Sequence, residues 1–231
     1  MKVLVTGATG FLGSRLAAAL AARGHTVRAL SRGGESRLPK RSVEVVRGDM
    51  RDKDSLRRAI AGVDAVCHGA AAMKGPWRDH EQTTVRGTEW LLELARGENV
   101  KRFIHLSSIT VYKTTGLERG TLIDESFPLD PEPEQRGPYP RAKIAAERQV
   151  GRNLELGLPT VVIRPGIVFG PGGRTMHPSV GYFLTKKCFL LVGRGDNPLP
   201  LTYVDNAVEG ILSALDSDQA VGQAYNLIDD S

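Results

Sequence analysis

The chain has 231 residues, of which 41% are hydrophobic and 25% are charged. This balance excludes a disordered or collagen-like chain, and the length allows a sizeable core. No stretch approaches the ~20 apolar residues of a membrane-spanning helix, and a glycine-rich turn interrupts the apolar N-terminus too early for a secretory signal. Cys67 and Cys188 lack the spacing of a metal or redox site. We therefore expect two buried, reduced thiols, a cytoplasmic location and no bound metal.

The formal net charge is +5. The basic residues are scattered, without long runs of like charge and without interleaved aromatic residues. This pattern predicts a solvated basic surface that favours anionic ligands, not a nucleic-acid interface. We therefore expect a small-molecule partner, and neither a nucleic acid nor a membrane.

Strand-like and helix-like segments alternate from the first residue. The first six predicted strands are Lys2–Thr6, Thr26–Leu30, Val43–Arg47, Asp64–His68, Arg102–Leu106 and Thr160–Arg164. The predicted helices between them are Phe11–Arg23, one containing Ser55–Ala61, Trp77–Gly97 and Pro140–Leu156. The polar, proline-rich connection 114–138 is long enough to suggest a function of its own. Beyond Pro165 the pattern weakens, and the predicted elements are a strand at Leu201–Val204, a helix at Asn206–Leu215 and a strand at Ala224–Leu227.

The alternation predicts an α/β fold in which a doubly wound parallel sheet of the Rossmann type is covered by helices on both faces. No linker or internal repeat divides the chain. We therefore expect one domain over residues 1–231, with substrate-side elements from about residues 166–200. The C-terminal substrate region is expected to be small or truncated.

The glycine-rich segment Thr6–Gly13, TGATGFLG, lies between the first strand and the first helix, where a dinucleotide fingerprint is expected. Gly7 allows a tight turn, Gly10 lets the backbone approach a pyrophosphate, and Gly13 lets the helix pack closely on the sheet. The helix N-terminus offers free N–H groups to the phosphates. The spacing is G-x-x-G-x-x-G, not the G-x-G-x-x-G of the commonest dehydrogenases. Its position favours a dinucleotide site over a plain turn.

The end of the second strand indicates which dinucleotide binds. NAD-binding folds usually place Asp or Glu there for the ribose 2′-hydroxyl, whereas this chain has Ser31 and Arg32. A guanidinium pairs with a 2′-phosphate and no carboxylate repels it, so we expect NADP in preference to NAD. The alternative for Arg32 is a plain surface arginine. Asp49, after the third strand, is a candidate for the adenine edge or for a cap of the following helix.

Tyr139 and Lys143 form a Y-x-x-x-K pair, which a helix places on one face, one turn apart. Tyrosine titrates near ~10, and both a nearby ammonium and the positive helix N-terminus favour its phenolate. We therefore expect a lowered pKa and proton exchange with a carbonyl or carbinol oxygen. Ser108, at the carboxyl end of the fifth strand, can hydrogen-bond that oxygen. A second pair, Tyr182 and Lys186, lies in the irregular C-terminal part, where we interpret it as structural.

These motifs in this order resemble the short-chain dehydrogenase/reductase superfamily, in particular its extended, epimerase/dehydratase-like branch. The resemblance covers essentially the whole chain. It rests on TGATGFLG at 6–13, HGAAA at 68–72, VRGT at 85–88, SSITVY at 107–112, RPGIVFGP at 164–171 and YVDN at 203–206. The Tyr-Val-Asp-Asn form is most similar to the 3β-hydroxysteroid dehydrogenase and dihydroflavonol reductase branches, which implies a less polar alcohol or ketone as substrate.

The resemblance implies hydride transfer between nicotinamide and a substrate carbon, with the redox chemistry supplied by the cofactor. It makes Tyr139 the acid/base and Ser108 the group that polarises the substrate oxygen. Lys143 would lower the pKa of the tyrosine and hold the nicotinamide ribose. The expected cofactor-binding residues are Gly7, Thr9, Gly10, Phe11, Leu12, Gly13, Arg32, Asp49, Met50, Ala70, Ala71, Tyr139, Lys143, Pro165 and Ile167. A homodimer through the helices at 77–97 and 140–156 is also implied.

Five positions depart from the family's pattern. Thr84 replaces the usual Asn of N-V-x-G-T, Lys113 stands where Gly is common, and Ala142 stands where Ser is common. None of these changes removes a catalytic group. Ile109 and Thr110 replace the acidic pair of the sugar-nucleotide dehydratases, so elimination of water is not expected.

The favoured function is an NAD(P)-dependent oxidoreductase of a secondary alcohol or ketone. A nucleotide-sugar epimerase of the same superfamily is the alternative within the enzyme class, although residues 199–204 lack the Arg that usually binds the diphosphate. A non-catalytic, NADP-binding regulatory protein is the alternative from another class; such proteins often lose the Tyr or Lys that this chain keeps. A serine hydrolase is excluded because no G-x-S-x-G elbow is present.

Overall fold

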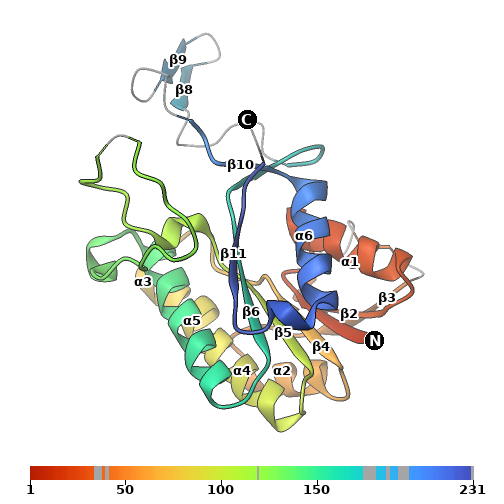
Figure 1. Cartoon of the computed structure of the whole chain (residues 1–231). Helices are drawn as coiled ribbons and strands as arrows, with labels where there is room; N and C mark the ends of the chain where they lie inside the picture. Colours follow the sequence, from red (N-terminus) through yellow and green to blue (C-terminus); the bar gives the residue numbers. More distant parts are fainter. Residues whose placement is uncertain are drawn as a thin grey trace.

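The computed structural model describes residues 1–33, 38–39, 42–118, 120–173, 181–185, 188–191 and 198–229. Its main sheet has seven strands in the order β11-β6-β5-β4-β1-β2-β3, and every neighbouring pair is parallel (Figure 1). The strands are β1 (Lys2–Thr6), β2 (Thr26–Ser31), β3 (Val43–Arg47), β4 (Ala65–His68), β5 (Arg102–Leu106), β6 (Thr160–Pro165) and β11 (Ala224–Leu227). The predicted doubly wound sheet is confirmed.

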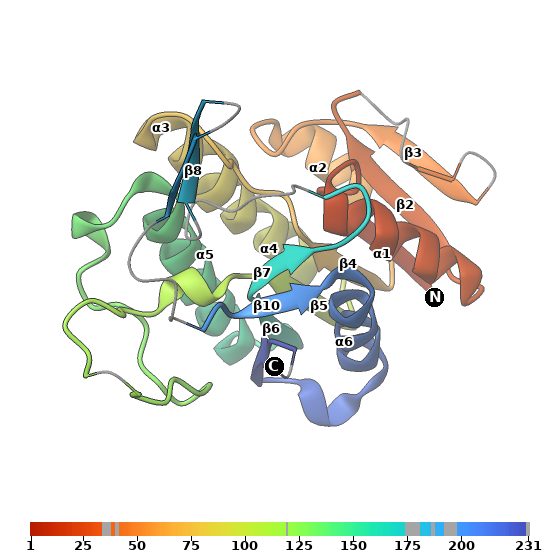
Figure 2. The ribbon, with the colours of Figure 1, turned by 90° about the horizontal axis from the view of Figure 1, so that it is seen from above.

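Helices cover both faces of this sheet (Figures 1 and 2). One face carries α1 (Phe11–Ala22) and α6 (Val204–Asp216), and the other carries α2 (Lys53–Ile60), α4 (Gly87–Gly97) and α5 (Pro138–Glu155). Side chains alternate between faces along a strand. Accordingly Val3 and Val5 of β1 pack in the cluster under α1 and α6, whereas Leu4 packs in the cluster under α2, α4 and α5.

The strand order reverses between β1 and β4. From β1 the chain proceeds to β2 and β3 at one edge, and from β4 it proceeds to β5, β6 and β11 at the other. The loops that follow β1 and β4 therefore diverge at the carboxyl end of the sheet. Such a switch point is where open α/β sheets bind their ligands.

The predicted helix at 77–97 is continuous but not uniform. It consists of α3 (Trp77–His80), a π-helical segment η2 (Glu81–Arg86) and α4. At the junction Gly87 lies so close to the loop after β3 that a Cβ there would be 2.8 Å from the Met50 carbonyl oxygen. The sequence periodicity predicted the helix but not its wider middle turn.

Short elements fill the connections. Three 3₁₀ helices are η3 (Ile109–Val111), η4 (Pro133–Gln135) and η5 (Asp218–Ala220). Beyond β6, β7 (Ile167–Phe169) pairs in parallel with β10 (Leu201–Tyr203), and β8 (Gly181–Thr185) pairs antiparallel with β9 (Cys188–Leu191). Among the described residues, no helix combines the length and the apolar character that crossing a membrane requires.

The C-terminal third contains the largest difference from the predicted elements. The strand at residues 201–204 was predicted, but β7, β8 and β9 were not. Tyr182 lies in β8, so the expectation that it belongs to an irregular segment was wrong. Its partner in the second Y-x-x-x-K pair, Lys186, lies outside the described residues. These strands pair outside the main sheet, where hydrophobic patterning of a central strand is not required.

Candidate active site

The turn after β1 is built by close backbone packing. Gly7 has a φ of +72°, and a Cβ there would lie 2.8 Å from the Gly69 carbonyl carbon. A Cβ on Gly13 would lie 2.2 Å from the Gly7 carbonyl oxygen. Gly10 donates its N–H to that same oxygen at 2.9 Å and forms the N-cap of α1. Side chains at the first and third glycines would therefore break the turn.

The N-terminus of α1 fits an anionic group. It has no side-chain cap and no acidic residue in its first turn. The N–H groups of Phe11 and Leu12 have no hydrogen-bond partner among the residues that the structure describes. Free amides and the positive end of the helix dipole together attract phosphate. The residues present therefore fit the pyrophosphate of a dinucleotide, with Thr9 half-buried in the same turn.

A hollow of about 340 Å³ lies at the carboxyl ends of β2 and β3. Its lining, called here the arginine-lined hollow, consists of Arg32, Arg47, Gly48, Asp49, Asp52, Ser55 and Arg58. The parallel register pairs Ser31 with Arg47, which places Arg32 and Arg47 at neighbouring strand ends. Arg47 and Arg58 were not predicted, although a search of every strand end for cations would have found Arg47.

The two carboxylates of the arginine-lined hollow are already engaged. Asp49 pairs with Arg51 at 2.8 Å, and this hydrogen-bonded guanidinium lowers the pKa of Asp49. Asp52 caps α2 by accepting hydrogen bonds from the backbone N–H groups of Asp54 and Ser55. The alternative interpretation of Asp49 as the helix cap was therefore wrong, because the capping residue is three positions later. Arg32 itself is exposed.

Ser108 and Tyr139 meet above the carboxyl end of β5. Ser108 caps η3, where its hydroxyl oxygen accepts hydrogen bonds from Thr110 N–H at 3.2 Å and Thr110 Oγ1 at 3.1 Å. Tyr139 lies in the first turn of α5, as predicted. Burial raises the pKa of Tyr139, and a hydrogen bond with the Ser108 side chain acts in the opposite direction. The two side chains therefore lie near each other at this end of the sheet.

Lys143 does not have the predicted effect on the tyrosine. Its ammonium donates a hydrogen bond to the Leu106 carbonyl oxygen at 2.6 Å. Burial lowers the pKa of Lys143 to about 8, against the opposing charge of Glu147. The expectation of a lowered Tyr139 pKa was wrong for this structure, because burial of the phenol outweighs the factors that favour phenolate. Tyr139 is therefore protonated at neutral pH.

A buried ion pair supports this end of α5. Arg164 of β6 pairs with Glu147 at 2.6 Å, and both side chains are less than 10% exposed. Glu147 also accepts a hydrogen bond from Ser107 at 2.5 Å, and Arg164 donates to the Tyr112 hydroxyl. This ion pair was not predicted. The sequence signal for Glu147 was its position one helical turn after Lys143. The pair fixes α5 to the ends of β5 and β6.

Further predicted residues lie on the same side of the sheet. The register pairs Leu106 with Ile163, so Pro165 at the end of β6 lies beside the start of the Ser108 turn. Ile167 begins β7 and is half-buried, as are Ala70 and Ala71 after β4, whereas Met50 is buried under Gly87. Predicted cofactor residues thus lie in the described loops after β1, β2, β3, β4 and β6.

Two aromatic contacts were not predicted. His80, at the end of α3, packs edge-on against Tyr139 with ring centroids 6.4 Å apart. Arg141 stacks over Trp77 at 3.8 Å from the ring centroid. His80 is 2% exposed, and its Nδ1 has no partner in the described part of the chain. These contacts join α3 to the beginning of α5.

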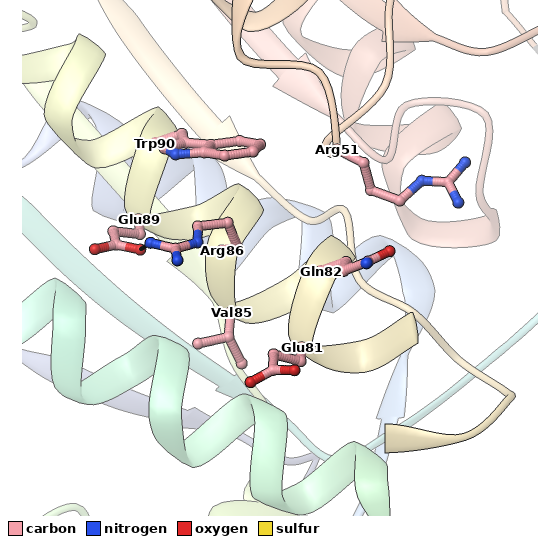
Figure 3. Close-up of a pocket in the computed structure, with 7 residues that line it drawn as sticks. All are labelled: Arg51, Glu81, Gln82, Val85, Arg86, Glu89 and Trp90. Atoms are coloured by element: carbon pink, nitrogen blue, oxygen red, sulfur yellow. Dashed lines mark hydrogen bonds and ion pairs between the residues drawn. The ribbon is translucent and has the colours of Figure 1, made fainter. Parts of the chain in front are cut away.

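A larger hollow, of about 700 Å³, lies apart from these residues (Figure 3). It is lined by Arg51, Glu81, Gln82, Val85, Arg86, Glu89 and Trp90. Figure 3 shows most of them on η2 and α4, with Arg51 opposite. Its lining includes neither Ser108 nor Tyr139. Size alone therefore does not identify the candidate active site.

Comparison with known proteins assigns the family. The family model for the NAD-dependent epimerase/dehydratase family matches residues 3–227. The chain belongs to this family. Its match extends from the first strand to the last, so the whole doubly wound sheet and the loops described above lie within it.

The chain is similar to several oxidoreductases in this family. It is 34% identical to 2-alkyl-3-oxoalkanoate reductase of Stenotrophomonas maltophilia, over 90% of this chain and 63% of that protein. It is 33% identical to a 3β-hydroxysteroid dehydrogenase/Δ5→4-isomerase of Mycobacterium tuberculosis, over 99% of this chain and 65% of that protein. The chain thus spans a little under two thirds of the length of these relatives.

Solved structures share the fold. UDP-glucuronic acid 4-epimerase from Bacillus cereus, in complex with NAD, superposes with a TM-score of 0.85 at 25% identity, over 100% of this chain and 79% of that one. The chain is also similar to a dTDP-glucose 4,6-dehydratase from Streptomyces venezuelae with NAD bound, with a TM-score of 0.82 at 26% identity. That alignment covers 98% of this chain and 75% of the other.

Proposed function

We propose that this chain is an NADP(H)-dependent oxidoreductase that transfers a hydride between nicotinamide and a secondary alcohol or ketone. The observation that carries the proposal is the grouping of Ser108, Tyr139 and Lys143 at the carboxyl end of β5, where Lys143 donates to the Leu106 carbonyl oxygen at 2.6 Å. This group lies at the same end of the sheet as the glycine turn, where a dinucleotide and a carbonyl compound can meet. Residues 166–200, of which the structure describes part, would contribute to the substrate side.

The protonation state of the pair suits reduction of a carbonyl. A protonated Tyr139 is a proton donor, and Ser108 can hydrogen-bond the same substrate oxygen. When bound, the nicotinamide supplies the hydride that reduces the substrate carbon. The proton that Tyr139 gives up converts the developing alkoxide into an alcohol, and the reverse steps oxidise the alcohol. Lys143 would hold the ribose hydroxyls by its ammonium, which is still mostly protonated at neutral pH although burial lowers its pKa to about 8.

The arginine-lined hollow supports a preference for NADP over NAD. Three of its seven lining residues are arginines, and its carboxylates are bonded to Arg51 or to the start of α2. Arg32 is expected to pair with the 2′-phosphate, and Arg47 and Arg58 would add positive charge beside it. Arg51, which pairs with Asp49, is not part of this lining.

The named activities of the relatives favour a ketone substrate. A reductase of 2-alkyl-3-oxoalkanoates and a 3β-hydroxysteroid dehydrogenase act on carbonyl or alcohol groups attached to apolar chains or rings. Nucleotide-sugar epimerization is the second candidate, because the superposed epimerase and dehydratase structures belong to sugar-nucleotide enzymes. The two functions differ in whether the dinucleotide is consumed.

We also propose a homodimer in a reducing, cytoplasmic compartment. The helices expected at the interface, α4 and α5, lie together on one face of the sheet (Figure 2). Cys67 and Cys188 are free thiols, which supports a reducing compartment. Cys67 is buried as predicted, but Cys188 is exposed, so that part of the prediction was wrong. Sedimentation at increasing concentration tests the assembly. A monomer at high concentration would contradict the homodimer.

The function is tested first by calorimetric titration with NADP(H) and then with NAD(H). We expect tighter binding of NADP(H), followed by NADPH oxidation when ketones are added. A preference for NAD(H), with interconversion of sugar nucleotides and no net cofactor turnover, would favour the epimerase. Binding of neither dinucleotide would contradict the proposal.

A further inference from the structure

The loop after β4 is held by a buried chain of hydrogen bonds. Ala70 N–H donates to Thr6 Oγ1 at 3.2 Å, and Thr6 Oγ1 lies 2.7 Å from His68 Nδ1. On the other side of the ring, His68 Nε2 lies 2.8 Å from Thr88 Oγ1. The three side chains are at most 1% exposed, so bulk water cannot replace any of these contacts.

Each proton in this chain has one consistent position. The Thr88 hydroxyl donates to the Thr84 carbonyl oxygen at 2.5 Å, so Thr88 Oγ1 accepts from His68 Nε2–H. His68 Nδ1 is then unprotonated and accepts from the Thr6 hydroxyl. Thr6 Oγ1 in turn accepts from Ala70 N–H. All four hydrogen bonds thus point in the same direction, from Ala70 N–H to the Thr84 carbonyl oxygen. This arrangement requires a neutral His68 imidazole, which burial favours.

A further hydrogen bond connects the end of this series back to the loop after β4. Thr84 Oγ1 accepts a hydrogen bond from Ala72 N–H at 3.0 Å. The amides of Ala70 and Ala72 are therefore both tied to one connected network. Among the described residues, the N–H of Ala71 between them has no hydrogen-bond partner. The network thus fixes the loop while leaving one amide for an acceptor from elsewhere.

Thr84 reaches the loop from the π-helical segment η2. It is 1% exposed and contributes both its hydroxyl, to Ala72, and its carbonyl, to Thr88. π-Helical turns occur frequently at functional sites. In this chain the wider turn places one buried threonine where it closes the network between β4 and α4.

We propose that Thr84 and His68 are positioning residues that hold residues 70–72 so that the Ala71 N–H faces an oxygen acceptor of the bound dinucleotide. This inference rests on the proposed function, because the ligand is the dinucleotide of that site. Neither side chain needs to touch the ligand. Their contribution is to keep the free amide in place before the ligand binds, which reduces the entropic cost of binding.

The decisive variant is Thr84→Val, which keeps the side-chain shape and removes the hydroxyl. We expect the Kd for NADPH, measured by fluorescence titration, to rise about 5- to 10-fold, as for loss of one hydrogen bond. The kcat at saturating NADPH should stay within about twofold, because Ser108 and Tyr139 are unchanged. Thr84→Ser restores a hydroxyl and should restore the Kd. The matched control Thr83→Val makes the same change at the preceding residue, which is half-buried and whose side chain has no hydrogen-bond partner among the described residues.

The outcomes separate this inference from the proposed function. If the wild-type chain binds neither dinucleotide, the proposed function fails and the inference fails with it. If the wild type binds NADPH and Thr84→Val binds it equally well, only the inference fails. Equal weakening in both valine variants would show a general effect on helix packing and would also overturn it.

A measurement on the unmodified chain covers the case in which Thr84→Val does not fold. Nitrogen-15 spectra of the imidazoles should show His68 as the Nε2–H tautomer, unchanged between about pH 5 and 8. A proton on Nδ1, or titration of His68 in this range, would break the directed chain and overturn the inference.

Discussion

The glycine turn after β1 and the arginine-lined hollow belong to the same candidate cofactor site but are built differently. The turn is backbone packed on backbone, with no space for a Cβ at Gly13. The hollow is lined by long side chains, of which Arg32 is exposed. Backbone amides can bind what all dinucleotides share, the pyrophosphate. The side chains of the hollow can be substituted without disturbing the backbone, so they can discriminate between dinucleotides. Affinity for the pyrophosphate and selectivity between NAD and NADP therefore have separate structural origins here.

The largest effect should come from the side chain that donates the proton. Tyr139→Phe removes the proton donor, and we expect turnover to fall about 1,000-fold, within the range of general acid catalysis. The Kd for NADPH should change by less than about twofold, because the glycine turn is untouched. Steady-state assays and titration of the same preparation measure both quantities. Tyr225→Phe, at a tyrosine of β11 that is 36% exposed, is the matched control. Unchanged turnover in Tyr139→Phe would remove this residue from the mechanism.

The backbone-built turn should fail for every dinucleotide at once. Gly13→Ala places a Cβ against the Gly7 carbonyl oxygen, and we expect a loss of about 2 to 3 kcal/mol in the free energy of unfolding. Binding of NAD and NADP should weaken together. Denaturant unfolding and calorimetry provide the measurements. Gly151→Ala in α5 meets no atom within 4 Å and should stabilise the chain by about 0.5 to 1 kcal/mol. Similar results for both variants would contradict the packing argument.

Substitution in the arginine-lined hollow should weaken binding of NADP but not of NAD. Arg32→Ala removes a guanidinium expected at the 2′-phosphate, so the Kd for NADP should rise about tenfold or more. The Kd for NAD should not change. Arg96→Ala, at an exposed arginine of α4, is the control and should leave both constants unchanged. Equal weakening of NAD and NADP by Arg32→Ala would mean that the residue does not recognise the 2′-phosphate.

The smallest expected effect is on the pH dependence of the free energy of unfolding, through His105 of β5. His105 is 1% exposed, neither ring nitrogen has a partner in the described part of the chain, and burial lowers its pKa well below the ordinary value. Near about pH 6.5, therefore, the His105 imidazole takes up a proton only in the unfolded chain. The free energy of unfolding should therefore fall as the pH drops below that value. His105→Phe should make this decrease shallower, as urea unfolding at pH 8 and pH 5 can measure. An unchanged pH dependence would show that other groups determine it.

The sequence was sufficient where one local pattern determines the outcome. Alternating apolar segments predicted the sheet, and the spacing of Gly7, Gly10 and Gly13 predicted a turn that the structure contains. The helical spacing of Tyr139 and Lys143 also predicted that they share a face of α5. These features depend on residues a few positions apart, so tertiary packing has little scope to change them.

The sequence was insufficient where segments meet only after folding. Arg58 joins the arginine-lined hollow because α2 packs beside β3, and no local pattern specifies that. The pKa of Tyr139 depends on how deeply the phenol is buried, which helical spacing does not report. Thr84, in the π-helical segment, meets Ala72 of the loop after β4 only in the folded chain. Such features require the positions of several elements at once.

The central position of β1 also determines when each of its two edges can be paired during synthesis of the chain. One edge of β1 can pair with β2 once Ser31 has been synthesised, but the other edge pairs with β4 and waits for His68. During this interval the nascent chain presents an unpaired strand of apolar residues, which is a template for association with other chains. Protection of the nascent chain is therefore most important before the fourth strand has emerged.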